Sequence, residues 1–297
     1  MKRSYEDWAL DAVIYISLTL LAFVTLYPFL NSLAISFNEG NDTASGGITL
    51  WPRVFTWDNY AYVFRDGKML HAFLITIART VSGTFLSILF TSMFAYGLSR
   101  RQLIGKKFYM IVCVITMYFS GGLIPSYLLI RDLHLMNTFW VMIIPGMISV
   151  WNMIIFRTFF QGLPDGLEES AKIDGCNHLT TFFLIALPVS GPVIATLSLF
   201  TAVGHWNAWF DATLYLTNEK LQPIQVVLNQ VINSTLEKDP SKEISATAQQ
   251  AQASLQAVTH QSVVMATMMV ATIPIMMVYP FVQKYFVKGV LVGSLKE

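Results

Sequence analysis

The chain has 297 residues, of which 54% are hydrophobic and only 12% are charged. Soluble domains carry about 25% charged residues, so this composition excludes an ordinary soluble protein and indicates one that lies in a lipid bilayer. The formal net charge is +1 and the basic residues are scattered, which argues against nucleic-acid binding. The two cysteines lie in unlike surroundings and the five histidines are dispersed, so we expect neither a disulfide nor a metal site.

Six apolar runs reach the roughly 20 residues that a membrane-spanning helix requires. They cover residues 12–36, 71–98, 108–130, 139–160, 189–210 and 263–281. The first run is too long for a signal-peptide core and no small-residue cleavage site follows it, so we interpret it as a retained span. The sequence therefore predicts one all-α, polytopic membrane domain over residues 1–297. Its other segments are a polar loop at 161–188, longer loops at 37–70 and 211–262, and a tail at 282–297.

Lysine and arginine are concentrated at one side of the predicted spans. That side carries the two ends of the chain, the short loop at 100–107 and the polar loop at 161–188. On the opposite side the basic residues are spread through much longer loops. Because short cytoplasmic loops carry an excess of Lys and Arg, we predict that both termini and the polar loop are cytoplasmic.

Three of the spans contain residues that are unusual inside a bilayer. Arg79 is the one basic residue well inside a predicted span, which suggests a functional role, although its side chain could instead snorkel to the outer surface. Gly121 and Gly122 precede Pro125 and should break the third span. The fourth span contains Pro145-Gly146 and, deeper, Asn152. These breaks could line a pathway, or small residues there could simply let helices pack closely.

The stretch Leu163–Cys176 is polar and typical of a helix, although membrane-length apolar runs flank it. Asp165 and Glu168 stand three residues apart, as the N-cap and N3 residues of a capping-box-like helix start. Gly175 can adopt the left-handed conformation that ends a helix. A second short helix is expected at about His178–Leu187. The stretch therefore predicts a helix-turn-helix outside the bilayer that is suited to docking on a partner.

This stretch resembles the EAA loop, the cytoplasmic coupling loop of the permease subunits of bacterial ABC importers. That family has Glu-Ala-Ala, three residues, Gly and a later Leu-Pro; here Glu169-Ser170-Ala171, Gly175 and Leu187-Pro188 match, with Ser170 as the departure. The resemblance implies the type I ABC importer permease fold, with six transmembrane helices and a coupling helix that contacts an ATPase. The residues expected at this contact are Glu168, Glu169, Ser170, Ala171, Asp174, Gly175 and Pro188.

Two further stretches resemble carbohydrate importers. Phe55–Tyr60 resembles the Phe-Thr-x-x-Asn-Tyr stretch before span two, and Trp206-Asn207 resembles a Trp-Asn-x-Phe stretch at the end of span five. Aromatic rings suit sugar faces and an amide suits hydroxyls, but aromatic belts at the membrane interface explain Trp51, Trp57 and Trp206 equally well. In the maltose importer the other permease subunit holds most of the sugar. The candidate substrate-pathway residues are Arg79, Gly121, Gly122, Asn152, Trp206 and Asn207.

The tail resembles the family's final stretch at Lys288, Gly289 and Gly293, and in maltose-type subunits this tail reaches into the ATPase dimer. Phe119–Pro125 and Glu169–Gly175 are closest to maltose-type second permeases of complex saccharides, so oligosaccharides or acidic fragments such as alginate are plausible cargo. The implied partners are a second homologous permease in a heterodimer, two copies of an ABC ATPase, an extracytoplasmic solute-binding protein and membrane lipid. The implied location is the bacterial inner membrane. The helix-prone stretch 246–257 could meet the binding protein or be merely solvated.

The sequence has no Gly-x-x-x-x-Gly-Lys-Ser/Thr phosphate loop and no recognisable catalytic grouping. We therefore expect a non-catalytic subunit that binds no cofactor, with ATP and Mg held by the partner ATPase. An alternative is a stand-alone ion-coupled secondary transporter, but such proteins usually have charged relay residues within their spans and repeat symmetry. A membrane scaffold or sensor would leave the predicted coupling loop without a purpose.

Overall fold

The computed structural model describes residues 5–65, 67–236 and 258–294. The described residues are nearly all helical and contain no β-strand beyond one isolated bridge between Asn38 and Phe55. The predicted all-α class is thus confirmed. The chain forms two compact units, each built from two stretches of sequence: unit 1 is Met1–Leu70 with Leu228–Ile273, and unit 2 is His71–Val227 with Pro274–Glu297. The prediction of one permease domain over residues 1–297 stays a prediction.

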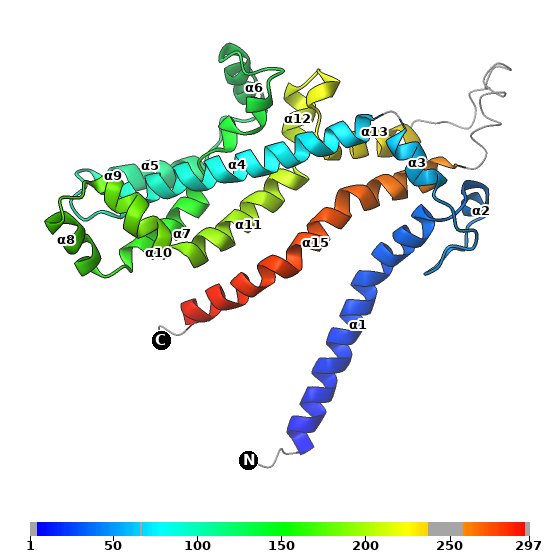
Figure 1. Cartoon of the computed structure of the whole chain (residues 1–297), viewed down its shortest axis with the longest axis horizontal. Helices are drawn as coiled ribbons and strands as arrows, with labels where there is room; N and C mark the ends of the chain where they lie inside the picture. The colour runs from blue at the N-terminus through cyan, green and yellow to red at the C-terminus, as the bar shows by residue number, and fades with distance from the viewer. Residues whose placement is uncertain (1–4, 66, 237–257, 295–297) are drawn as a thin grey trace. The chain divides into compact units, whose positions relative to one another are not determined.

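Unit 1 contains a long helix with a mostly apolar, exposed surface. Helix α1 (Tyr5–Ser36) has a mean hydropathy of 2.1 in its most apolar window, and none of that window is buried. A helix that is hydrophobic all round needs an apolar surrounding, which a bilayer provides. Two short helices, α2 (Gly40–Ala44) and α3 (Asp58–Phe64), follow it, and the first part of α15 (His260–Ser294) also belongs to the unit (Figure 1).

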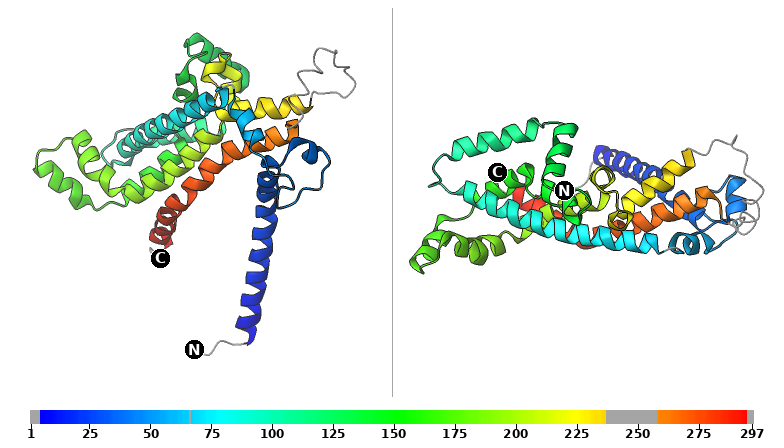
Figure 2. Two further views of the ribbon diagram at one scale, coloured as in Figure 1. Left: turned by 45° about the vertical axis from the view of Figure 1, so that its right-hand side comes forward. Right: turned by 90° about the horizontal axis from the view of Figure 1, so that it is seen from above.

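Unit 2 is a bundle around the long helix α4 (Lys68–Ser99), whose first residues belong to unit 1. Helix α7 contacts both α5 and α11. Figure 2 shows α8 at one end of this bundle. The other elements are α5 (Lys106–Tyr118), α6 (Leu123–Asp132), η1 (Phe139–Met142), η2 (Ile144–Gly146), α7 (Val150–Gln161), α8 (Asp165–Ile173), α9 (His178–Thr181), η3 (Phe182–Ala186), α10 (Leu187–Val189), α11 (Gly191–Asn207), α12 (Phe210–Tyr215), η4 (Glu219–Leu221) and α13 (Ile224–Leu236), which ends in unit 1.

Two apolar clusters form the core of unit 2. One lies toward α8 and is dominated by the aromatic side chains of Tyr96, Phe156, Phe160 and Phe182. The other gathers residues of α6, η1, α12 and α13, with Ala212 fully buried. Because interior side chains interlock closely, these clusters fix the ends of the helices that carry the polar sites described below.

Three helices are long and apolar enough to cross a membrane: α1, α4 and the stretch His260–Val278 of α15. Three bent pairs qualify only if each pair counts as one span, so the described residues hold between three and six spans. Lys106–Tyr118 and Leu123–Asp132 meet at 113°, and Phe139–Gly146 and Val150–Gln161 meet at 50°. The third pair, His178–Val189 and Gly191–Asn207, meets at 83°.

The helices therefore break within residues 108–130, 139–160 and 189–210, and the span bounds themselves stay a prediction. The break at the third span lies where the glycines predicted it, since Gly122 has φ 86°, which side chains larger than hydrogen disfavour. At the fifth, the predicted start at residue 189 is the end of α10, and the helix resumes at Gly191 with Pro192 in its first turn. Proline suits that position because it has no N–H to leave unpaired.

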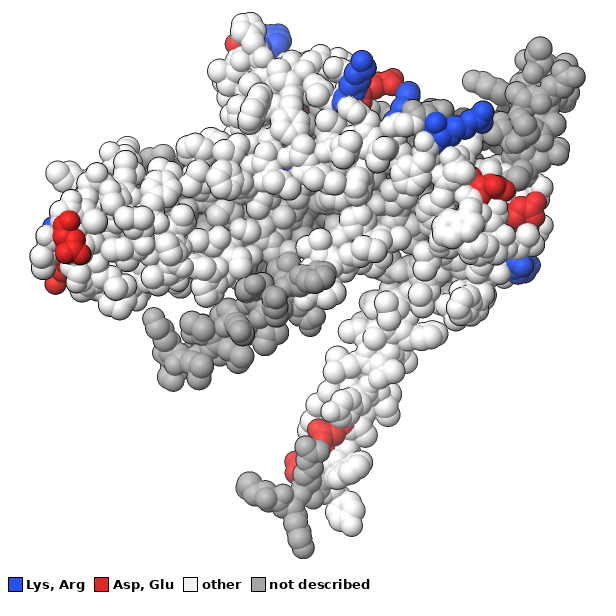
Figure 3. Space-filling view, in the orientation of Figure 1, with Lys and Arg blue, Asp and Glu red and all other residues white. Residues whose placement is uncertain are grey.

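Charge is distributed along unit 2 as a membrane-spanning bundle requires. In the face drawn in Figure 3, acidic and basic atoms gather around α8 and near α6, and the surface between them is uncharged. A bilayer excludes exposed charge from its hydrocarbon core, so this uncharged surface is the part of unit 2 that fits within it.

Candidate coupling helix and transport cavity

Helix α8 and the short helices after it form the predicted helix-turn-helix. The end of α8 follows the sequence, since Gly175 has φ 79° and the Cys176 N–H donates to the Ala171 carbonyl at 2.9 Å. This is a Schellman ending, in which a left-handed glycine satisfies the last free carbonyls. The start differs from the expected capping box, because Pro164 is the N-cap and provides no side-chain hydrogen bond. Asp165 is instead the first helical residue.

Helix α8 has one face against the bundle and one face open. Ala171 is buried, and Glu168 is partly buried. Glu169, Ser170 and Asp174 are exposed, and so is Gly175. An exposed face of this kind, next to a face that is held in place, is what a docking helix requires.

Ile173 adds an apolar side chain to that open face. It is 85% exposed, close to the C-terminal end of α8. A large apolar side chain left in water at a rigid helix end is a common anchor of protein interfaces. Ile173 was not among the predicted contact residues, although an isoleucine at the end of a mostly polar helix was a signal for it.

An arginine from the end of α4 fastens α8 to the bundle. Arg100 Nη1 pairs with Glu168 Oε1, and its guanidinium lies 4.2 Å from the centre of the Tyr96 ring. Arg100 Nε also donates to Ser99 Oγ at 3.0 Å. Tyr96 in turn packs edge-on against Phe160, with 5.6 Å between ring centres. A planar guanidinium can form these ionic and aromatic contacts at once.

Beyond α8 the chain turns through three short helices. Asn177 caps α9, because its side chain accepts from the Thr180 N–H at 2.8 Å. The next segment, η3, is a π-helix that turns Phe182 into the aromatic core. α10 follows with Pro188, which is exposed. One regular helix over His178–Leu187 was expected, and the π-helical turn is the correction.

A second polar site lies inside unit 2. A cavity of about 650 Å³ is lined by residues of α4, α6, η1, η2, α7, α11 and α12. Its polar lining includes Asn152, which donates to Thr201 Oγ1 at 3.2 Å, and the hydroxyls of several serines. The lining also includes Arg79, Ser126, His205, Phe210 and Asp211.

Arg79 is the most deeply placed charge of this cavity. Its side chain is 2% exposed, its Nη2 pairs with Asp211 Oδ2, and its Nη1 donates to the Ala208 carbonyl at 3.0 Å. Burying an arginine is costly unless a counter-charge and hydrogen bonds compensate it, and both are present here. The alternative that Arg79 snorkels to the surface is therefore wrong.

The predicted pathway residues do not all meet at this cavity. Arg79 and Asn152 line it. Gly121 and Gly122 lie at the bend between α5 and α6, and Trp206 is buried edge-on against Phe73. Asn207 is exposed as the last residue of α11.

The tail residues lie on the last part of α15, where side chains are outside the described set. They are Lys288, Gly289 and Gly293. The helix-prone stretch 246–257 also lies outside the described residues. In the part of the chain that is described, no three histidine, cysteine or acidic side chains gather as they would around a metal ion.

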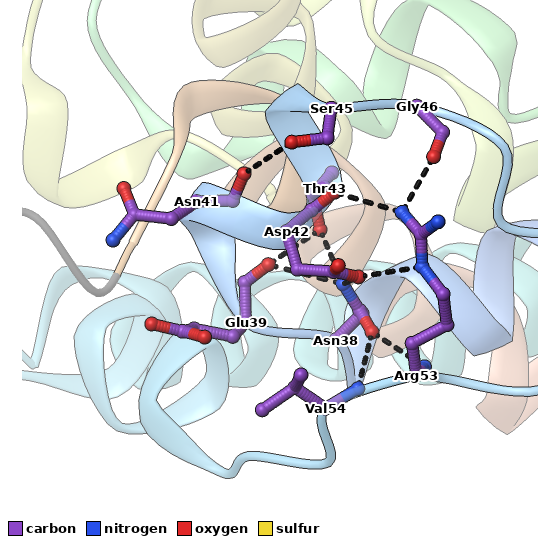
Figure 4. Close-up of polar contacts among 9 residues, drawn as sticks. All are labelled: Asn38, Glu39, Asn41, Asp42, Thr43, Ser45, Gly46, Arg53 and Val54. Atoms are coloured by element: carbon purple, nitrogen blue, oxygen red, sulfur yellow. Dashed lines mark hydrogen bonds and ion pairs between the residues drawn. The ribbon is translucent and has the colours of Figure 1, made fainter.

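A third polar cluster organises the loop that follows α1 in unit 1. Asn38 is fully buried, and its side-chain amide uses both its oxygen and its nitrogen (Figure 4). Arg53 closes the loop by donating from Nε to Asp42 Oδ2 at 2.9 Å and from Nη2 to the Gly46 carbonyl at 2.5 Å. The five partners of the Asn38 side chain are Glu39, Asp42, Thr43, Arg53 and Val54.

Residues 4–292 match the family model for a binding-protein-dependent transport system inner membrane component. The chain belongs to this family. It is thus an inner-membrane permease component of an ABC transporter, as the coupling-loop resemblance predicted. This membership supports the permease role over a stand-alone secondary transporter.

Relatives of the permease align over nearly its whole length. The polygalacturonan/rhamnogalacturonan transport system permease protein YtcP of Bacillus subtilis (strain 168) is 43% identical over 288 residues, covering 96% of this chain and 98% of that protein. The arabinooligosaccharides transport system permease protein AraQ of Halalkalibacterium halodurans is 26% identical over 301 residues, covering 100% of both.

A solved structure has the same fold. It is a chain of a bacterial ABC transporter involved in the import of the acidic polysaccharide alginate, with a TM-score of 0.87 and 29% identity. The match covers 96% of the permease and 99% of that chain. The predicted type I importer permease fold is thereby confirmed.

Two ion-pair partners in the permease were not identified from the sequence. Asp211 follows the fifth apolar run and Arg79 lies in the second, so a search for opposite charges near spans would have paired them. Arg100 is one of two adjacent arginines, and nothing in the sequence says which one contacts α8.

Proposed function

We propose that this permease forms part of an ATP-driven importer that moves a saccharide, an oligosaccharide or a polysaccharide fragment, into the cytoplasm. Three named relatives carry saccharide descriptions, for polygalacturonan and rhamnogalacturonan, for arabinooligosaccharides and for alginate. The cargo proposal extends this shared class to the present chain. Alginate-type acidic fragments belong to that class along with neutral oligosaccharides.

The main support for this mechanism is that one side of α8 is held against the bundle while the other side is exposed. Its inner side is fastened through Ala171 and the Arg100–Glu168 pair, and its outer side offers Glu169 and Ile173. An ATPase that closes around ATP would move such a helix as a rigid body. Coupling between distant sites needs an element that both sites bias, and a fastened helix with an open face can serve as one.

The complete importer would contain this chain paired with a second homologous permease, two copies of an ABC ATPase and an extracytoplasmic solute-binding protein. ATP and Mg would be held by the ATPase, and this chain would bind neither. Both termini and α8 would face the cytoplasm, since the basic residues favour that orientation. Lys288, Gly289 and Gly293 would provide a second ATPase contact.

Two substitutions on the open side of α8 test this function. Gly175→Asp forces a side chain into a left-handed backbone conformation, and Glu169→Lys reverses an exposed charge. Both should abolish ATP-dependent saccharide uptake while membrane insertion is retained. Asp132→Lys makes the same charge change at an exposed site near α6 and should leave uptake unaltered. Normal uptake in both variants would contradict the proposed coupling mechanism.

A further inference from the structure

The Arg79–Asp211 pair sets the charge of the transport cavity. Arg79 is almost fully buried and Asp211 is 32% exposed, so the carboxylate is the more accessible member of the pair. Both oxygens of Asp211 are engaged, because Oδ2 meets Arg79 and Oδ1 accepts from the Ala212 N–H at 2.9 Å. The carboxylate is therefore fixed in place beside the guanidinium rather than swinging freely.

An anion entering this cavity would meet both members of the pair. The attraction of Arg79 is offset by the repulsion of Asp211, which lies closer to the open side. A ligand carboxylate could reach the guanidinium fully only by displacing Asp211, which would leave that carboxylate without its counter-charge. The pair thus works against anion capture.

Uncharged hydroxyl groups meet no such repulsion. Arg79 Nε is buried and has no hydrogen-bond partner among the described residues, so it is a donor without an acceptor. Asp211 is a partly exposed acceptor on the same wall, and Asn152 provides an amide elsewhere in the lining. Sugar hydroxyls donate and accept at once, which suits adjacent donors and acceptors. The exposed ring of Phe210 adds an apolar face.

We propose that this wall of the cavity binds a saccharide unit through its hydroxyl groups, and that Asp211 is a specificity residue that offsets the charge of Arg79 so that neutral units are favoured over uronates. The inference rests on the proposed function, since it names the chemical class of unit that the cavity of the importer accepts. A cargo of mixed units would place a neutral or esterified unit here.

The test compares two probes of equal chain length, an oligogalacturonide and its fully methyl-esterified form, in ATP-dependent uptake by the complete transporter. The binding protein is the same in every assay, so its own preference cancels when variants are compared. Asp211→Asn removes the offsetting charge and should raise the acid-to-ester uptake ratio about tenfold or more, since a charge near a bound carboxylate in a partly dry site is worth at least that factor.

Two further variants keep the test decisive if Asp211→Asn fails to insert. Arg79→Met leaves Asp211 alone and should lower the acid-to-ester ratio. The double change Arg79→Met with Asp211→Leu removes both charges and should keep the ratio within about twofold of the wild type even if total uptake falls. Asp132→Asn, at an exposed acid, is the matched control.

The inference is overturned if uptake of both probes falls together in the single variants at an unchanged ratio, because the pair would then serve only to hold α4 against α12. Absence of ATP-dependent uptake of either probe by the wild type is a different result. It would contradict the proposed saccharide cargo, and this inference with it.

Discussion

Arg100 directly follows α4, and the contacts of its side chain explain how a short polar helix keeps a defined position. The ion pair with Glu168 and the stacking on Tyr96 are only partly open to solvent, with 17% of the arginine side chain exposed. A single exposed ion pair contributes little to stability. Removing one partner of a pair that is shielded in this way costs more, because the other charge is left partly buried without a counter-charge.

Removing the Arg100 side chain should weaken transport and ATP hydrolysis together. In Arg100→Ala we expect uptake and binding-protein-stimulated ATP hydrolysis to fall together by about tenfold, as the loss of a partly buried pair implies. Arg100→Lys should recover part of the loss, because it restores the charge but not the planar contact with Tyr96. Both activities are measured on the reconstituted transporter.

Arg131→Ala is the matched control for this change. It also removes an ion pair, with Asp132, but both side chains are more than half exposed, at 58% and 66%. Its activities should stay within about twofold of the wild type. If Arg100→Ala behaved like this control, the proposed fastening of α8 would be contradicted.

Asn38 is the residue on which the loop that follows α1 depends. Asn38→Ala should remove five hydrogen bonds, among them those that the Arg53 and Val54 N–H groups donate, and so loosen the loop and raise its backbone hydrogen-exchange rate at least about tenfold. Asn41→Ala is the control, since the Asn41 side chain points away from the cluster in Figure 4. Equal exchange in the two variants would show that the cluster does not hold the loop.

The same loop should respond to acid. The Asn38 amide, followed by Arg53, lowers the pKa of Asp42 below its ordinary value of 3.8. The pKa of Asp42 is lower in the folded loop than in the unfolded chain. The ionised carboxylate therefore stabilises the folded loop fully above pH 3.8, and this stabilisation is lost as the pH falls through the folded-state pKa. Exchange of this loop should therefore be independent of pH near neutrality after correction for the intrinsic rate, and should accelerate below pH 3.8.

At the scale of elements, α4 and α11 approach each other closely at Gly83, where there is no room for a side chain. A Cβ added at Gly83 would lie 2.7 Å from Nε2 of His205, whereas one added at Gly97 would meet open space. Gly83→Ala therefore forces the two helices or the imidazole ring to shift. Gly97→Ala only restricts the unfolded chain and improves helix propensity.

These two substitutions in one helix should have opposite effects. Gly83→Ala should destabilise the transporter by about 1–3 kcal/mol, and Gly97→Ala should stabilise it by about 0.5–1 kcal/mol. Thermal unfolding of the detergent-solubilised transporter measures both. A melting temperature that rises in Gly83→Ala would contradict this. It would mean that the His205 ring moves aside without loss of stability and that the close approach does not hold α4 to α11.

At the scale of the whole molecule, the sequence predicted the features that depend on neighbouring residues alone. The length of the apolar runs predicted the helices of the bundle. Gly122 and Gly175 predicted a bend and a helix end, because both take positive φ angles that residues with a side chain disfavour. The EAA-like spacing predicted the helix-turn-helix. What could not be predicted depends on distant contacts: the partner of Arg79, the arginine that holds α8, and the π-helical turn that buries Phe182.

The central claim is that this chain is the membrane part of an ATP-driven saccharide importer. The most direct measurement is gentle solubilisation of the complex from membranes by a tag on this chain, followed by identification of its partners and assay of ATP hydrolysis. We predict a second permease and a phosphate-loop ATPase, with hydrolysis that is stimulated by a solute-binding protein loaded with saccharide. A chain that emerged alone and moved solute on a proton or sodium gradient would contradict it.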